Sequence, residues 1–247
     1  WHRECRELIG ESSPSEEKPF NLNHPASHCP ACGQGIKPWE NVPILSWLFL
    51  KGRCSNCGVS ISLRYPIVEA MTATLSLVVA YYFGVSWETL GALVLTWALI
   101  SLSLIDFDVQ LLPDSITLPF VWLGLLLSLF GIFTDTHSAI IGALAGYLSL
   151  WSVFQIFKLL TGKEGMGYGD FKLLAMLGAW LGWQYLPQII MLSALVGAVV
   201  GLSLILMRGR DKNIPIPFGP YLATAGWISL IWGDAINHAY LTWSGLA

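Results

Sequence analysis

Residues 89–105 read TLGALVLTWALISLSLI, an apolar stretch without a single charged residue. About 17–25 such residues allow a helix to cross the roughly 30 Å hydrocarbon core of a membrane. Six further apolar runs lie around this stretch, and most of them reach a similar length. The seven runs cover approximately 66–83, 89–105, 115–133, 138–157, 172–186, 187–207 and 214–233. The pattern predicts an all-α polytopic membrane protein with seven transmembrane helices, of which the fifth is the shortest.

The composition agrees with this class. The chain has 247 residues, of which 54% are hydrophobic and 12% are charged. The charged share is about half that of an ordinary soluble domain. Disordered, collagen-like and coiled-coil proteins are excluded by these values. A soluble globular domain is disfavoured, because its surface needs more charge.

The basic residues predict how the chain is oriented. Of the thirteen Lys and Arg residues, seven lie in 1–64 and none in 65–157. Alternating the seven runs from a cytoplasmic head at 1–64 puts every remaining basic residue in an inside loop. These residues are Lys158, Lys163, Lys172, Arg208, Arg210 and Lys212. Because basic residues gather on the cytoplasmic side of membrane proteins, we expect a cytoplasmic head over 1–64 and a membrane domain over 65–247.

Carboxylates lie beside two of the apolar runs at the same predicted membrane face. Asp106 comes directly after the run that ends at Ile105, and Asp170 opens the helix of the fifth run, after Gly165-Met-Gly-Tyr-Gly. Ionisable residues beside hydrocarbon are costly and usually functional. Two carboxylates held together share a proton, so one can activate water while the other protonates the leaving group. The arrangement is typical of an aspartic protease.

Simpler interpretations remain for each carboxylate. A single Asp at a helix end is often a cap or a solvated charge. We expect Asp114, after Pro113, to cap the third helix, and Asp170 could cap its own helix in the same way. Asp108 lies two residues from Asp106 and would point to the other side of a helix. At most one of these two can face Asp170, and the spacing does not say which.

Four cysteines in the head have the spacing of a metal site. Cys29-x2-Cys32 and Cys54-x2-Cys57 are each followed by glycine. Four thiolates so placed suit tetrahedral zinc, with no open position for water. Two disulfides or a redox pair are the alternatives, and a cytoplasmic head disfavours disulfides. We expect one structural zinc ion. The head has too few basic residues to predict nucleic-acid binding.

These motifs together resemble a known family. The stretch Asp106-Phe-Asp-Val-Gln-Leu-Leu-Pro-Asp114 and the sequence Gly165-Met-Gly-Tyr-Gly-Asp170 are similar to those of the type IV prepilin peptidases. These enzymes belong to the GxGD class of intramembrane aspartyl proteases. The paired CxxC motifs, Arg64-Tyr-Pro-Ile-Val-Glu69 and Pro215-Ile-Pro-Phe-Gly-Pro-Tyr221 are similar to the same family. The resemblance runs from about residue 23 to 235.

The resemblance implies more than the spacing does. It assigns Asp106 and Asp170 as the catalytic pair. It implies removal, on the cytoplasmic side of the bacterial inner membrane, of the short basic leader of type IV prepilins and type II secretion pseudopilins. The cut falls after a glycine, and the new N-terminal amine is then methylated with S-adenosylmethionine. The family normally has a further transmembrane helix before the head, making eight. The donor-binding residues stay unassigned, with Gly52-Arg53 only a candidate region, and Glu69 is expected either to pair with Arg64 or to serve this second activity.

A non-enzymatic membrane scaffold or transporter with a structural zinc head is the alternative function. Transporters place their ionisable residues near the middle of the membrane. Here the carboxylates gather at one face, which favours a site for a substrate that enters from the cytoplasm.

Overall fold

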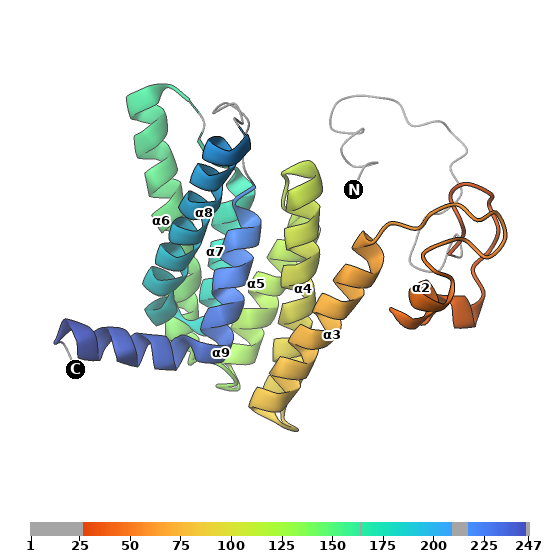
Figure 1. Cartoon of the computed structure of the whole chain (residues 1–247). Coiled ribbons are helices and arrows are strands. Elements are labelled where there is room, and N and C mark those ends of the chain that lie inside the picture. The colour runs from red at the N-terminus through yellow and green to blue at the C-terminus, as the bar shows by residue number, and fades with distance from the viewer. Residues whose placement is uncertain (1–26, 164, 209–216, 246–247) are drawn as a thin grey trace, which may run out of the picture. The chain divides into compact units, whose positions relative to one another are not determined.

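The structure is a computed structural model that describes residues 27–163, 165–208 and 217–245 (Figure 1). The predicted loop over 208–213, with Arg210 and Lys212, lies almost entirely outside these residues. The chain divides into two compact units, Trp1–Leu75 and Ser76–Ala247. Each unit is described by itself below.

The first unit is small and mostly irregular in its described part. It contains the 3-10 helix η1 (Pro38–Asn41), the short helix α2 (Leu45–Phe49) and the first part of α3 (Arg64–Phe83). Two isolated antiparallel bridges join His28 to Gly35 and Arg53 to Ser60. Little apolar surface is buried here, since Cys29 is the only buried apolar side chain among the residues described before α3. A unit of this kind needs another source of stability.

The second unit is a bundle of helices. Its elements are α4 (Trp87–Val109), α5 (Asp114–Ser128), α6 (Thr136–Thr161), α7 (Tyr168–Leu181), η2 (Trp183–Tyr185), α8 (Leu186–Arg208) and α9 (Gly219–Ser244), together with the end of α3. Each predicted apolar run coincides for most of its length with one helix. The all-α class is confirmed, because the described residues contain no strand apart from the two bridges.

The predicted count of seven membrane-crossing helices is not fully supported. In the described part of the chain, four helical segments are long and apolar enough to cross a membrane: Arg64–Phe83, Trp87–Val109, Thr136–Thr161 and Trp183–Ser203. The helices α5 and α7 have 15 and 14 residues. At about 1.5 Å per residue they are roughly 21–23 Å long, which is shorter than the hydrocarbon core. The helix α9 is longer, but it carries Asp234 and His238 in its C-terminal half and changes direction along its length (Figure 1).

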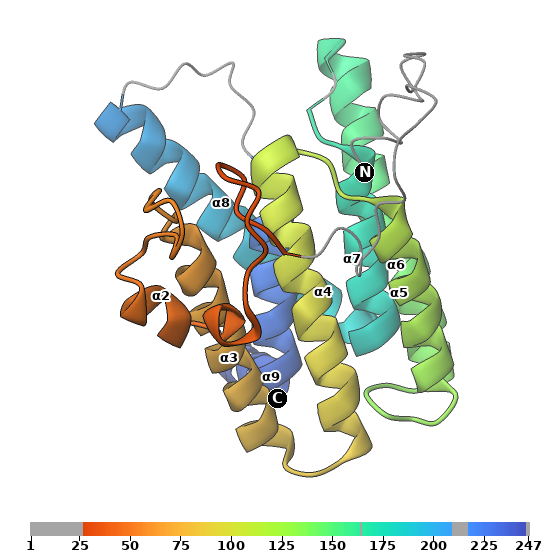
Figure 2. The same cartoon turned by 90° about the vertical axis from the view of Figure 1, so that its right-hand side faces the viewer.

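The helix α7 forms the centre of the bundle. It packs against α5, α6, α8 and α9 (Figure 2). Every residue from Phe171 to Leu181 is buried except Lys172. The indole N–H of Trp180 donates to the carbonyl of Phe120 in α5 at 2.8 Å. An element so enclosed holds any side chain near its ends in a fixed place.

Glycines bring α6 unusually close to α7. A Cβ atom added to Gly146 would lie 2.6 Å from the carbonyl oxygen of Leu174, and Gly142 and Gly178 meet backbone to backbone. Gly142 and Gly146 form a GxxxG pattern on α6. Small residues with this spacing let membrane helices approach closely, because packing rather than the hydrophobic effect drives helix association in lipid.

Several helix ends meet at one end of the bundle. The C-terminal ends of α4, α6 and α8 lie at the same end as the N-terminal ends of α5, α7 and α9 (Figure 1). This end therefore brings together the segment that follows α4 and the segment that opens α7. These segments carry the predicted acidic residues.

Candidate functional site

Asp106 lies in the last turn of α4. The helix ends where Gln110 adopts a left-handed conformation, with φ of 54° and an N–H that donates to the carbonyl of Asp106. The Asp106 side chain is only 5% exposed. Its Oδ2 atom accepts a hydrogen bond of 3.0 Å from the backbone N–H of Gly219, the first residue of α9. A carboxylate at the end of a membrane helix is therefore turned into the protein.

Asp170 lies in the first turn of α7. The helix begins after Gly167, which occupies the N-cap position without a side-chain cap, and the Asp170 N–H donates to the Gly167 carbonyl at 3.3 Å. The Asp170 side chain is 7% exposed. Because Asp170 lies inside the helix, the alternative that it is an N-cap is wrong.

The two carboxylates are neighbours, although 64 positions separate them in the chain. They lie close enough for their charges to interact. Leu112 links the segments that carry them. A Cβ atom added to Gly169, beside Asp170, would lie 2.7 Å from the Leu112 Cβ, and one added to Gly219 would lie 3.3 Å from the Leu112 Cδ1. A buried pair of carboxylates whose charges interact can share a proton, as the chemistry of acid–base hydrolysis requires.

The first unit holds a cluster of the four cysteines. One sulfur atom from each of Cys29, Cys32, Cys54 and Cys57 lies within 4.8 Å of the others. The Sγ atoms of Cys29 and Cys57 are 3.8 Å apart. Zn–S bonds of about 2.3 Å in tetrahedral geometry place two sulfur atoms roughly 3.8 Å apart. All four are free thiols, so the alternative of two disulfides is not what the structure has.

Both CxxC segments form the same loop. The N–H groups of Gly33 and Gly58 donate to the carbonyls of Cys29 and Cys54 at 2.9 and 3.0 Å. Both glycines have left-handed φ values, 70° and 71°, which explains why glycine follows each pair. Each loop is closed by one of the two antiparallel bridges. Two equal loops facing each other present four sulfur atoms from two sides, as a tetrahedral ion needs.

The thiols of the cluster differ in acidity. Backbone N–H groups of Cys57 and Asn56 lower the pKa of Cys54 to about 7. The Gln34 backbone and the Asn56 amide lower the pKa of Cys32. For Cys57, the Val59 N–H acts in the same direction, but burial and the other thiols of the cluster outweigh it and raise the pKa to about 11. Clustered thiolates repel one another, and a divalent cation removes that repulsion.

Comparison with known proteins gives the family. Residues 93–202 match the model of the type IV leader peptidase family, and residues 7–83 match that of the bacterial peptidase A24 N-terminal domain. A prepilin leader peptidase/N-methyltransferase of Pseudomonas aeruginosa is 55% identical over 99% of this chain and 84% of its own length. Enzymes of the same name from Aeromonas salmonicida and Dichelobacter nodosus are 56% and 51% identical over 98% and 94% of this chain, and 84% and 80% of their own lengths. The chain belongs to the type IV leader peptidase family. No solved structure matches it.

In this leader peptidase family member, the other two acidic residues of the 106–114 segment have different surroundings. Asp108 is exposed, so of Asp106 and Asp108 only the former is buried beside Asp170. The prediction that Asp114 caps its helix is wrong, because Pro113 occupies the N-cap position. Asp114 instead accepts two hydrogen bonds of 2.6 Å from the Lys172 ammonium. The Asp114 carboxylate thus binds the Lys172 ammonium of another helix and does not cap its own helix.

Three residues that support the acidic pair were not predicted from the sequence to do so. Leu112 and Gly219 had no predicted role, and Lys172 was predicted only to mark the cytoplasmic side. The one sequence feature that could have pointed to Gly219 is the stretch that resembles the family, to which it belongs. Its hydrogen bond uses a backbone N–H, which no side-chain pattern can predict. Glu69 accepts a 2.7 Å hydrogen bond from the N–H of Ile44, a residue with a left-handed φ of 62°. Glu69 therefore supports the first unit locally.

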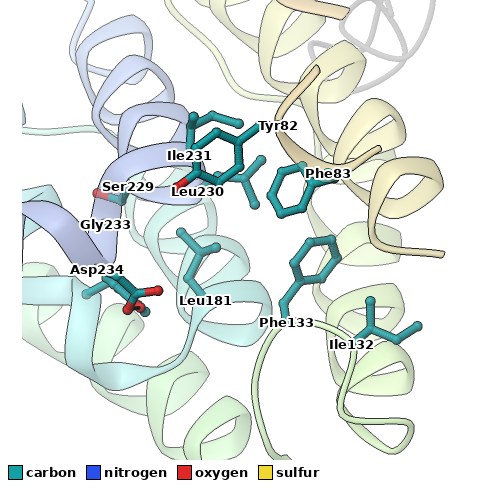
Figure 3. A pocket seen from close by; sticks show the side chains of 11 residues that line it. Tyr82, Phe83, Ile132, Phe133, Leu181, Ser229, Leu230, Ile231, Gly233 and Asp234 are labelled. Carbon is teal, nitrogen blue, oxygen red and sulfur yellow. Dashed lines mark hydrogen bonds between the residues drawn. The ribbon is translucent and has the colours of Figure 1, made fainter. Parts of the chain in front are cut away.

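Two cavities lined by described residues of the bundle lie away from the acidic pair. One of about 170 Å³ is lined by aromatic and aliphatic side chains of α3, α9 and the loop before α6, with Ser229 and Asp234 as polar members (Figure 3). Asp234 accepts a hydrogen bond from the Tyr185 hydroxyl. Phe83 at the end of α3 and Tyr185 after α7 place this cavity at the end of the bundle opposite the acidic pair. Neither Asp106 nor Asp170 lines it.

Proposed function

We propose that this family member is a bifunctional intramembrane aspartic endopeptidase and N-methyltransferase. It removes the basic leader of type IV prepilins and type II secretion pseudopilins after a glycine, and then methylates the new N-terminal amine. The names of relatives that are more than 50% identical support both activities. The burial of Asp106 and Asp170 at adjoining helix ends carries the peptidase proposal.

Asp106 and Asp170 are the proposed catalytic residues. The ionised carboxylate takes a proton from the water that attacks the carbonyl carbon, and the protonated carboxyl donates its proton to the carbonyl oxygen. When the tetrahedral intermediate collapses, the first carboxyl passes the proton from water to the leaving amine, and the second takes back the proton of the gem-diol hydroxyl as the C–N bond breaks. A pair shielded from bulk water retains a shared proton because two close negative charges are costly.

Of the three glycines before Asp170, Gly167 leaves space beside the pair for a locally extended substrate segment, because the only atom within 4 Å of a Cβ added there is the Asp170 Oδ2 at 3.9 Å. Phe157 and Leu112 fill the positions next to Gly165 and Gly169.

Cys29, Cys32, Cys54 and Cys57 would hold one structural zinc ion. With four protein ligands, no position is open for water, so the site has no hydrolytic role. The ion would supply folding free energy to a unit that buries little apolar surface. S-adenosylmethionine is the proposed methyl donor, on the basis of the family resemblance and the relatives' names.

We propose that 1–64 is a cytoplasmic zinc-binding head associated with methyl transfer, and that 65–247 is the protease domain of a multi-pass protein of the bacterial inner membrane. The lipid bilayer and the prepilins are its partners, and nucleic acid is not. The distribution of Lys and Arg supports a cytoplasmic position for the head and the acidic pair.

Purified protein in detergent tests the proposal with a prepilin and with an already cleaved pilin as substrates. Appearance of the shortened pilin and transfer of a labelled methyl group from S-adenosylmethionine are expected. Absence of both activities in folded, zinc-loaded protein would favour the scaffold or transporter alternative.

A further inference from the structure

The first turn of α9 has an unusual N-terminal partner. Helix N-termini leave backbone N–H groups without an intrahelical acceptor, and a polar side chain next to the helix in sequence usually accepts one of them. The N-cap residue here is Phe218, which cannot do so. Asp106 of α4 accepts the Gly219 N–H instead, over a separation of 113 residues. One member of the proposed catalytic pair thus caps another helix.

The contact also requires glycine. A Cβ atom at position 219 would lie 2.7 Å from the Asp106 Oδ2 and 3.1 Å from its Cγ, closer than real Cβ atoms approach other atoms. Any side chain would therefore displace the carboxylate. The same added Cβ would lie 3.3 Å from the Leu112 Cδ1, so it could not relieve the clash by moving toward Leu112. The hydrogen bond from the Gly219 N–H and the close approach of the Gly219 backbone together fix the position of the Asp106 carboxylate.

The hydrogen bond engages one oxygen of the carboxylate. With Oδ2 held by Gly219, Oδ1 is the Asp106 oxygen that remains for proton transfer in the proposed mechanism. The N-terminus of α9 also favours negative charge at Asp106. The position and the charge of this group therefore depend on where α9 begins.

We propose that Gly219 is a positioning residue for peptide-bond hydrolysis, acting through its backbone N–H and its lack of a side chain on the Asp106 carboxylate. This inference rests on the proposed peptidase function. It assigns the start of α9 to the active site, together with the end of α4 and the start of α7.

Gly219→Ala in the full chain tests the role, with cleavage of a prepilin followed over a range of substrate concentrations. Small displacements of a catalytic group reduce turnover strongly, so we expect kcat to fall by about tenfold to a hundredfold, with KM changed less than about twofold. Gly233→Ala is the matched control. It lies on the same helix, and its added Cβ would meet the Tyr185 ring at 2.6 Å, at the opposite end of the bundle. Gly233→Ala is expected to keep the wild-type kcat.

If Gly219→Ala does not fold, the single variant Leu112→Ala is compared with the double variant Leu112→Ala/Gly219→Ala. The Leu112→Ala change removes the Leu112 side chain that the new Cβ at position 219 would otherwise contact. A further fall in kcat on adding Gly219→Ala supports the role. Wild-type kcat in a folded Gly219 variant, or an equal fall in Gly233→Ala, would overturn the positioning role alone. No cleavage by the wild-type chain would overturn the peptidase proposal and this inference with it.

Discussion

Lys172 and Asp114 join the second turn of α7 to the first turn of α5. The Lys172 Nζ lies 2.6 Å from both carboxylate oxygens of Asp114. Lys172 follows Asp170 by two residues, so this ion pair holds the segment that carries one of the proposed catalytic groups. It also removes Asp114 from the candidates for catalysis, since its charge is already paired.

Asp114→Asn is expected to weaken cleavage severalfold without abolishing it. The side chains of Lys172 and Asp114 are 26% and 53% exposed, so solvent screens the pair, and its loss should cost less than about 1 kcal/mol of stability. Prepilin cleavage and thermal unfolding in detergent measure the two effects. The exchanged pair Asp114→Lys with Lys172→Asp should recover part of the activity. Complete inactivity of a folded Asp114→Asn variant would make Asp114 a catalytic candidate instead.

One zinc ion per chain is expected in the purified protein. Elemental analysis measures it, and Cys29→Ser should lower the zinc content, because the remaining three thiols leave the tetrahedral site incomplete. The first unit should then become more sensitive to proteolysis, since metal binding and folding are coupled in so small a unit. Ser60→Ala, on a loop of the same unit but without a sulfur, is the control. Purified protein with four free thiols and no metal would contradict the site.

Gly178→Leu is expected to destabilise the helical bundle. The Gly178 backbone touches that of Gly142 in α6, so a side chain there must force the two helices apart. Overpacking of this kind costs about 1–3 kcal/mol or more, visible as a lower unfolding temperature in detergent. Gly197→Ala is the milder control, because its added Cβ lies 3.3 Å from the edge of the Tyr221 ring. Equal stability of the two variants would mean that α6 and α7 do not pack as described.

Much of the fold could be predicted from hydrophobic runs, because lipid-facing helices are apolar all round and need no fine pattern. The run at 89–105, for example, lies within α4. The number of membrane-crossing helices was less predictable. The run at 172–186 continues past the end of α7 at Leu181 into η2, so apolar sequence alone did not reveal a short helix followed by a turn at Gly182.

The candidate site was also only partly predictable from the sequence. The cysteine cluster follows from local spacing, since each CxxC loop is built by neighbouring residues. Burial of Asp106 beside Asp170 agrees with the topology that charge placement predicted. The residues that contact the acidic segments could not be predicted from the sequence. Lys172 pairs with a residue 58 positions away, and Gly219 acts through its backbone. Such contacts depend on how helices meet in space.

The decisive experiment on the acidic pair measures cleavage of a prepilin leader by purified wild-type, Asp106→Asn and Asp170→Asn proteins. Asp108→Asn is the matched control, because Asp108 is an exposed carboxylate on the same helix end. We expect cleavage by the wild type and by Asp108→Asn, and none by Asp106→Asn or Asp170→Asn, although both fold and bind zinc. Wild-type cleavage by either Asp106→Asn or Asp170→Asn would contradict the acidic pair.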